Sequence, residues 1–133
     1  MWADSQTQGT GEVPDSTVLV IDIDPNSPTY NQVIDVDPTT TETDGLPVGN
    51  LPFNSAVSPD GSVAYVVNVL DGTVTIIDTA TNEQLGEPFV YDLTPQTMTG
   101  GTVYVNILAI SPDGKRMYIS KNQDDTVTAI SVA

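Results

Sequence analysis

Closely spaced acidic residues are the part of this sequence best suited to chemistry. Asp22 and Asp24 stand two residues apart, as do Asp35 and Asp37. Residues two apart on a β-strand point to the same face, and carboxylate oxygens are ligands that Ca²⁺ prefers. The four aspartates are therefore candidates for a calcium site. Each pair also ends directly before a proline, so a role in ending strands and starting turns is the favoured alternative.

The composition excludes several other kinds of chemistry. The chain of 133 residues has no His and no Cys, and its 18 Asp and Glu against 3 Lys and Arg give a formal net charge of −15. A Ser-His-Asp triad, a cysteine nucleophile, a zinc site built on thiolate or imidazole, and a disulfide are all excluded. We expect no cofactor other than calcium. The negative charge also argues against a nucleic-acid partner and leaves a protein or carbohydrate as the expected partner.

An internal repeat organises the chain. The segment AVSPDG at 56–61 returns as AISPDG at 109–114, and TVTIID at 73–78 returns as TVTAIS at 126–131, both at an offset of 53 residues. A partial third copy lies upstream, where STVLVID at 16–22 matches GTVTIID at 72–78. Coincident matches at one offset indicate repeated supersecondary units.

The repeated unit predicts an all-β fold. Short runs rich in Val, Ile and Tyr lie between turn residues, and Ser58-Pro59-Asp60-Gly61 is typical of a tight reversal. Connections this short join antiparallel strands. Runs such as AYVV at 64–67 are apolar on both faces and need cover on both sides, as in the stacked four-stranded blades of a β-propeller. The expected strands are 17–24, 31–37, 53–58, 63–69, 73–79, 84–91, about 103–111, 116–121 and 126–132.

The expected strands make about two and a quarter blades. Residues 1–15 are expected to be a flexible leader, followed by a propeller fragment over 16–133, with a partial blade at 16–37, a full blade at 53–91 and a partial blade at 103–132. Closed propellers have roughly 4–8 blades. We therefore expect either a piece of a larger propeller or a chain that self-associates through uncovered blade faces. No apolar run is long enough to span a membrane, and no signal peptide is recognisable.

The repeats resemble the YVTN-type β-propeller family. Residues 56–83 resemble one copy and 109–131 a diverged copy, in which Tyr118-Ile119-Ser120-Lys121 replaces the Tyr65-Val66-Val67-Asn68 pattern. The resemblance implies a secreted or cell-surface scaffold without catalytic residues. The expected function is accordingly a non-enzymatic binding or structural module that recognises its partner through long inter-blade loops. The alternative is a fragment of a propeller enzyme, a metal-dependent hydrolase or lactonase.

The candidate binding residues lie in the loops at one end of the expected blades. The segments 38–52 and 92–102 are long inter-blade connections, and the hairpins between second and third strands share their end of the ring. Passive, solvated insertions are the alternative. The nine polar candidates are Asp44, Asn50, Asn54, Asn68, Asp71, Asp92, Asn106, Asp124 and Asp125.

The basic residues are clustered in the sequence. All three fall between Lys115 and Lys121, whereas the 114 residues before them hold none. This asymmetry predicts an electrostatic contact with an acidic neighbouring blade. Plain solvation of the basic side chains is the alternative.

Overall fold

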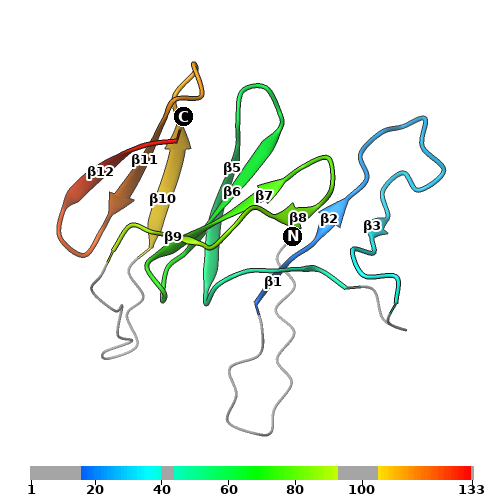
Figure 1. Ribbon diagram of the computed structural model, residues 1–133, viewed down its shortest axis with the longest axis horizontal. Helices are drawn as coiled ribbons and strands as arrows, with labels where there is room; N and C mark the ends of the chain where they lie inside the picture. Colours follow the sequence, from blue (N-terminus) through cyan, green and yellow to red (C-terminus); the bar gives the residue numbers. More distant parts are fainter. Residues whose placement is uncertain (1–15, 40–43, 93–104, 133) are drawn as a thin grey trace, which may run out of the picture.

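The computed structural model describes residues 16–39, 44–92 and 105–132 (Figure 1). The expected leader at 1–15 and most of the second inter-blade loop lie outside the described residues. Every regular element in the described part is a β-strand, so no helix there could cross a membrane. The strands form four antiparallel sheets. The two small sheets nearest the N-terminus together make what we call the first blade, and the other two sheets are the middle and last blades.

The middle blade contains the complete repeat. Strands β5 (Pro52–Val57), β6 (Val63–Asn68) and β7 (Thr73–Asp78) pair antiparallel in that order. The fourth strand consists of two short pieces, β8 (Glu83–Gln84) and β9 (Phe89–Val90), which both pair with β7. The continuous fourth strand expected over 84–91 is therefore interrupted. Gly86, whose φ is 68°, takes the chain away from the ladder between the two pieces.

The last blade repeats the first three strands of the middle blade. Strands β10 (Asn106–Ile110), β11 (Arg116–Lys121) and β12 (Thr126–Ser131) pair antiparallel. The bounds of β11 and β12 lie 53 residues after those of β6 and β7. The predicted repeat is thus confirmed at the level of single strands.

The first blade includes a strand, β4 (Leu46–Pro47), that lies inside the segment 38–52, which was expected to be an inter-blade loop. Strand β1 (Thr17–Val18) pairs with β4, and β2 (Val20–Ile21) pairs with β3 (Val33–Ile34). Here too the fourth strand is split, into β3 and β4. The segment 38–52 is therefore not one inter-blade loop, because β4 lies within it and pairs with β1 of the first blade, and only 48–51 lie between β4 and β5.

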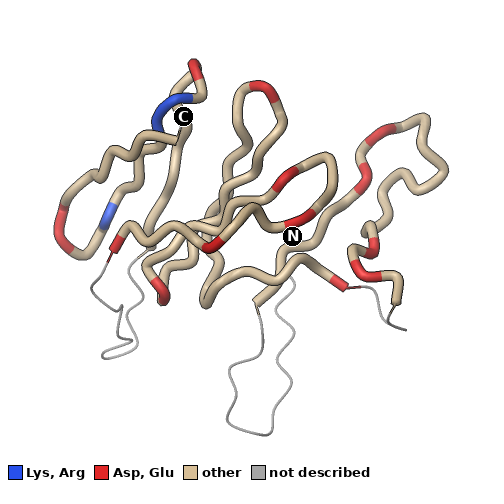
Figure 2. The backbone as a smooth tube through the Cα atoms, in the orientation of Figure 1, with Lys and Arg blue, Asp and Glu red and all other residues tan. Residues whose placement is uncertain are grey.

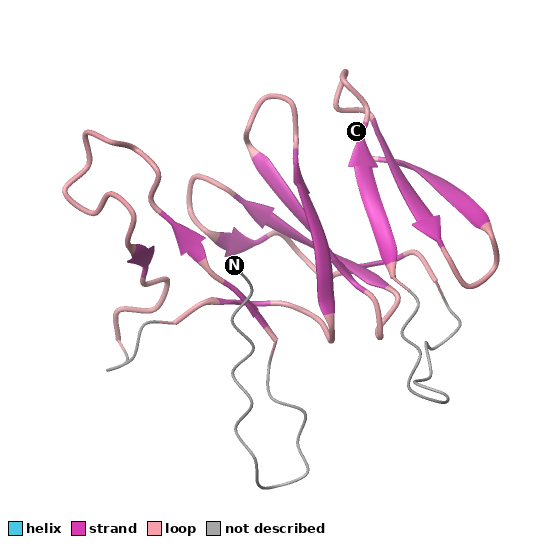
Figure 3. Ribbon diagram, turned by 180° about the vertical axis from the view of Figure 1, so that it is seen from behind, coloured by secondary structure: helices cyan, strands magenta, loops and turns pink. Residues whose placement is uncertain are grey.

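Seen from behind, the sheets of the three blades stand side by side (Figure 3). Two apolar clusters hold the blades together. Between the middle and last blades, Tyr65, Val67 and Val74 pack with Met117 and Ile119. Between the first and middle blades, Leu46, Val66 and Ile77 form a smaller cluster. Successive blades stack face to face, as the doubly apolar strands predicted. The fold is an all-β, unclosed fragment of a β-propeller.

The Ser-Pro-Asp-Gly turns adopt the predicted reversal. Ser58 Oγ donates to Asp60 Oδ1 at 2.6 Å, and Ser62 N donates to the same oxygen at 3.1 Å. Gly61 takes a φ of 76°, and Gly114 takes 70° in the equivalent turn. Hydrogen bonds to the charged carboxylate, first from Ser58 and then from Ser62, lower the pKa of Asp60 to about 2.

This shift predicts a component of acid sensitivity. Because the folded-state pKa of Asp60 lies below the ordinary 3.8, its stabilising contribution is present above pH 3.8 and is lost as the pH falls toward 2. We expect Asp60→Asn to flatten the dependence of melting temperature on pH in that window. Ser58→Ala, which removes the strongest cause, should flatten it in part. Identical pH profiles for Asp60→Asn and wild type would contradict this account of the turn.

Candidate functional site

The two ends of the blades differ in their charged and buried polar side chains. The loop end comprises residues 48–51, 69–72, 91–92 and 122–125, and the turn end comprises 22–32, 58–62, 79–82 and 111–115. Figure 2 shows acidic residues at both ends and basic residues only in the last blade. Buried polar side chains gather at the loop end, where Asn68, Asp92 and Asn106 are all buried. We therefore place the candidate site there.

In the middle blade, three predicted candidates meet at the loop end. Asn50 donates to Asp71 twice, from its backbone N at 2.6 Å and from Nδ2 at 2.8 Å. Beside them, the fully buried Asn68 donates through Nδ2 to the hydroxyls of Thr75 at 2.8 Å and Thr73 at 3.0 Å. These bonds fix the hairpin after β6 against the connection from the first blade. They leave Asn68 Oδ1 without a hydrogen-bond partner in the described part of the chain.

A glycine brings the next loop segment close to this hairpin. Gly72 has a φ of 64°, and its carbonyl accepts from Tyr91 N at 3.0 Å and from Asp92 N at 3.1 Å. A Cβ at position 72 would lie 2.4 Å from the Asp92 carbonyl oxygen. Only glycine allows this approach. The middle hairpin thereby sets the position of Asp92, where the connection to the last blade begins.

Lys121 joins the two blades at this end. Its Nζ lies 3.2 Å from Asp92 Oδ2 and donates to Asp124 Oδ2 at 2.9 Å. The side chains of Lys121 and Asp92 are only 14% and 5% exposed, whereas that of Asp124 is about half exposed. The bonds to Asp124 and then to Asp92 raise the pKa of Lys121 above its ordinary value. For Lys121, the predicted contact of the basic cluster with an acidic neighbouring blade is present.

Tyr91 completes a group of polar side chains at the loop end, which we call the loop-end cluster. Its members are Asn50, Asn68, Asp71, Tyr91, Asp92, Asn106, Lys121 and Asp124. Asn106 Nδ2 donates to the Tyr91 hydroxyl at 2.7 Å, and Asn106 Oδ1 accepts from Asn122 N at 3.4 Å. Burial is the main cause that raises the pKa of Tyr91, with the Asn106 bond acting in the opposite direction. Tyr91 and Lys121 were not among the nine candidates. The repeat could have pointed to Lys121, which occupies the position of Asn68, whereas Tyr91 is marked only by directly preceding the candidate Asp92.

The other three candidates make none of these contacts in the described part of the chain, although Asp125 lies at the loop end. Asn54 Oδ1 accepts from Leu108 N at 2.9 Å and ties β5 to β10, so it does not converge with Asn106 on a carboxylate. Asp125 holds a φ of 53° at the repeat position of Gly72. Asp44 lies just before β4 in the first blade, and its N donates to Asp35 Oδ1 at 3.1 Å. None of the three joins the loop-end cluster.

The four calcium candidates act in turns. They follow β2 and β3 rather than lying within them, so the same-face argument does not apply. Asp22 accepts from Asp24 N at 2.9 Å and from Thr29 Oγ1 at 2.6 Å. Asp35 accepts from Asp37 N at 3.2 Å. In the described ranges, no group of three or more potential metal-ligating residues comes together.

We expect calcium to leave the stability of the chain unchanged. The carboxylates of these four residues already accept hydrogen bonds from the backbone and hydroxyl groups of their own turns. Melting temperatures with excess calcium and with a chelator should therefore coincide. A rise in melting temperature with calcium that is abolished in Asp22→Asn or Asp35→Asn would support the calcium site and contradict this expectation.

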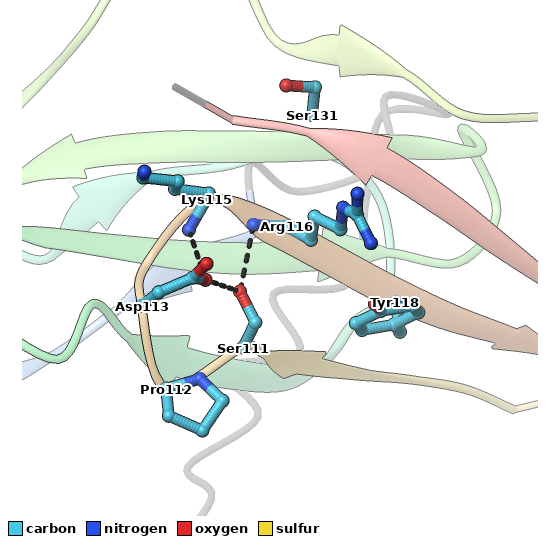
Figure 4. Close-up of a pocket in the computed structure, with 7 residues that line it drawn as sticks. All are labelled: Ser111, Pro112, Asp113, Lys115, Arg116, Tyr118 and Ser131. Atoms are coloured by element: carbon cyan, nitrogen blue, oxygen red, sulfur yellow. Dashed lines mark hydrogen bonds between the residues drawn. The ribbon is translucent and has the colours of Figure 1, made fainter.

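A shallow hollow marks the opposite end of the last blade. Figure 4 shows its seven lining residues, which are Ser111, Pro112, Asp113, Lys115, Arg116, Tyr118 and Ser131. The hydrogen bonds among these lining residues are those of the second Ser-Pro-Asp-Gly turn. Lys115 N donates to Asp113 Oδ1 at 3.1 Å, and Arg116 N donates to Ser111 Oγ at 2.9 Å. These contacts serve the turn itself. The buried polar groups of the loop end are the better candidates for chemistry.

The ion pair at the loop end predicts a stability effect. Lys121→Met leaves the buried Asp92 carboxylate without its ammonium partner, so we expect the free energy of unfolding to fall by about 1–3 kcal/mol. Because the pKa of Lys121 is raised, the pair contributes below pH 10.5 and loses its effect only above that value. Chemical denaturation checks the effect, with Lys115→Met at the turn end as the matched control. Equal stability of the two variants would contradict it.

Comparison with known proteins supports the β-propeller fold and indicates a class of enzymes. The family model described as "Lactonase, 7-bladed beta-propeller" matches residues 17–133. The crystal structure of a candidate 6-phosphogluconolactonase from Bacteroides uniformis is 22% identical over 86% of this chain, with a TM-score of 0.59. Hydrazine synthase of Kuenenia stuttgartiensis is 24% identical over 70% of the chain, with a TM-score of 0.49 that is too low to carry an argument. No curated protein matches significantly.

These matches correct two expectations. The chain covers only 30% of the Bacteroides uniformis protein and 23% of the hydrazine synthase chain, and at such low identity the structural likeness shows the fold alone. The predicted β-propeller is confirmed, but the matching family is not the YVTN or surface-layer type. The expectation of a non-enzymatic module was wrong, because the family model describes lactonases. The repeats alone could not distinguish the two, since both kinds of propeller share the blade.

Proposed function

Because this chain belongs to the lactonase family of seven-bladed β-propellers, we propose that it forms part of a propeller that hydrolyses lactones. The family match over 17–133 is the observation that carries the proposal. The B. uniformis structure suggests sugar lactones as the substrate class. A chain with fewer than three complete blades would act together with further blades that close the ring.

The reaction sets simple chemical requirements. Water attacks the lactone carbonyl carbon, a base takes its proton, and negative charge develops on the carbonyl oxygen. The ring C–O bond then breaks, and the ring oxygen receives the proton, which gives a hydroxy acid. The site must therefore hold a base within reach of water and a fixed positive charge or hydrogen-bond donor near the developing oxyanion.

Two residues of the loop-end cluster suit these roles. Lys121 is held between Asp92 and Asp124, so its ammonium is positioned without further rearrangement. We assign it the stabilisation of the oxyanion. Asp124 is the more exposed of the two carboxylates and can take a proton from water. Asp92, almost fully buried, positions Lys121.

The surrounding polar groups hold this arrangement in place. Asn106 and Tyr91 bond to each other directly beside Asp92. Asn50 and Asp71 fix the neighbouring hairpin in the same way. Their part is to keep the loop end rigid while substrate binds, since precise placement of reacting groups accounts for much of enzyme catalysis.

Acid release from a sugar lactone tests the proposal. With the whole protein at constant pH, we expect hydrolysis of glucono-δ-lactone or its 6-phosphate faster than the spontaneous rate. Lys121→Met should lower kcat at least about 100-fold, whereas Lys115→Met at the turn end should keep the wild-type rate. A rate no higher than the spontaneous one for both lactones would refute the proposal.

A further inference from the structure

The hydroxyl of Tyr91 has a hydrogen-bonding capacity that the loop-end cluster does not use. Its oxygen accepts from Asn106 Nδ2 at 2.7 Å, but within the described ranges its proton has no acceptor. The tyrosine ring is partly buried between the middle and last blades, where it packs against the larger apolar cluster. Tyrosine hydroxyls in such surroundings usually donate as well as accept. The Tyr91 proton is therefore available to a substrate at the loop end.

Asn106 fixes the direction of this hydrogen bond. Its Oδ1 accepts from Asn122 N at 3.4 Å, and a backbone N–H can only donate. The amide nitrogen of Asn106 must therefore face Tyr91, and because that nitrogen also only donates, the Tyr91 oxygen must be the acceptor. Asn106 is 1% exposed, so water does not compete for its amide. The Tyr91 proton is thereby directed away from Asn106.

Tyr91 lies beside the ion pair that the proposed reaction uses. Its partner Asn106 is opposite Lys121 in the register of β10 and β11. The backbone N atoms of Tyr91 and Asp92 both donate to the Gly72 carbonyl. Burial is the largest cause that raises the pKa of Tyr91, and the charges of Asp92 and Lys121 raise and lower it, respectively. The hydroxyl therefore keeps its proton at neutral pH while lying within the field of the ion pair.

Tyr91 is better suited than Lys121 to give up a proton. The Lys121 ammonium donates to Asp124 at 2.9 Å and lies 3.2 Å from Asp92, and these bonds raise its pKa. The two carboxylates thus hold the ammonium protons in place, whereas in the described part of the chain no carboxylate holds the Tyr91 proton. An alkoxide leaves readily only if it receives a proton as its C–O bond breaks. The reaction therefore needs such a donor besides the base and the oxyanion partner.

We propose that Tyr91 is a catalytic residue, the acid that protonates the ring oxygen of the lactone as the ring opens. This role rests on the lactone hydrolysis proposed above. Water adds to the carbonyl carbon while Asp124 takes its proton and Lys121 faces the oxyanion. The carbonyl then reforms, the electron pair of the ring C–O bond passes to the ring oxygen, and that oxygen takes the Tyr91 proton. The phenolate recovers a proton from Asp124 through solvent, so lactone and water give one hydroxy acid.

Removal of the hydroxyl alone tests this role. In the whole protein, Tyr91→Phe should keep the packing of the ring but lower kcat for glucono-δ-lactone at least about 100-fold, with KM nearly unchanged. Tyr30→Phe loses the same group from an exposed tyrosine at the turn end of the first blade and should keep the wild-type rate. A Tyr91→Phe rate close to that of wild type overturns the proposal. A wild type without activity refutes the proposed function itself and the role of Tyr91 with it.

A double variant separates direct action of the hydroxyl from an effect through Asn106. If Tyr91 only held Asn106 in place, Tyr91→Phe would cost nothing further once Asn106 is replaced by alanine. We expect it to lower kcat at least about 10-fold more in the Asn106→Ala background, because the proton donor is still lost there. Equal rates of Asn106→Ala and the double variant would make the hydroxyl a structural group and overturn the proposal.

The hydroxyl can also be followed without turnover. In protein labelled with ¹³C at the tyrosine Cζ atoms, saturating gluconate should shift the resonance of Tyr91, which Tyr91→Phe identifies by its loss. The resonance of Tyr30 should stay in place. If gluconate shifts the backbone amides of 122–125 but leaves the Tyr91 resonance unchanged, ligand binds at the loop end without contacting the hydroxyl. That result would overturn the role of Tyr91 while leaving the proposed function intact.

Discussion

Replacing Gly72 by alanine should destabilise the protein by about 2–4 kcal/mol. The added Cβ would lie 2.4 Å from the Asp92 carbonyl oxygen, and the φ of 64° disfavours any side chain. The hairpin would have to separate from the segment that carries Asp92. Chemical denaturation measures the loss of unfolding free energy.

Gly61→Ala is the matched control for this prediction. Gly61 has a similar φ of 76°, but a Cβ there would have no heavy atom within 4 Å. Its substitution should therefore cost only the backbone term of about 1 kcal/mol. Equal losses for the two variants would mean that close packing at the loop end contributes nothing.

Ile119→Ala should lower the free energy of unfolding by about 2–5 kcal/mol. Ile119 is fully buried between the middle and last blades, so its truncation leaves a cavity in the larger apolar cluster. Val57→Ala, at an exposed position of β5, should change the stability by less than about 0.5 kcal/mol. Denaturant titration at a protein concentration that keeps the chain monomeric compares the two variants. A small loss for Ile119→Ala would contradict face-to-face packing of the blades.

Features set by local chemistry could be predicted from the sequence. The Ser-Pro-Asp-Gly turns formed as expected because Pro, Gly and the aspartate side chain determine such a reversal over four residues. The strands equivalent to β6 and β7 could be placed because their apolar runs are long and bounded by turn residues. The stacking of blades followed from strands that are apolar on both faces.

Features that depend on neighbouring segments could not be predicted. The split fourth strand is invisible in the sequence, because two-residue pieces such as β4 and β9 are held by their partner strands rather than by their own pattern. The cluster around Lys121 requires Asp92 from the preceding blade. The distinction between scaffold and enzyme was missed because the residues of a propeller site come from several blades.

The central claim is that ligand binds at the loop end, and backbone amide shifts during titration with gluconate, the expected hydroxy-acid product, test it most directly. We predict that the amides of 71–72 and 122–125 shift with a common dissociation constant, while those of the turns at 58–62 and 111–115 stay in place. Lys121→Met should weaken this binding. Shifts confined to the two turns, or none at saturating gluconate, would contradict the claim.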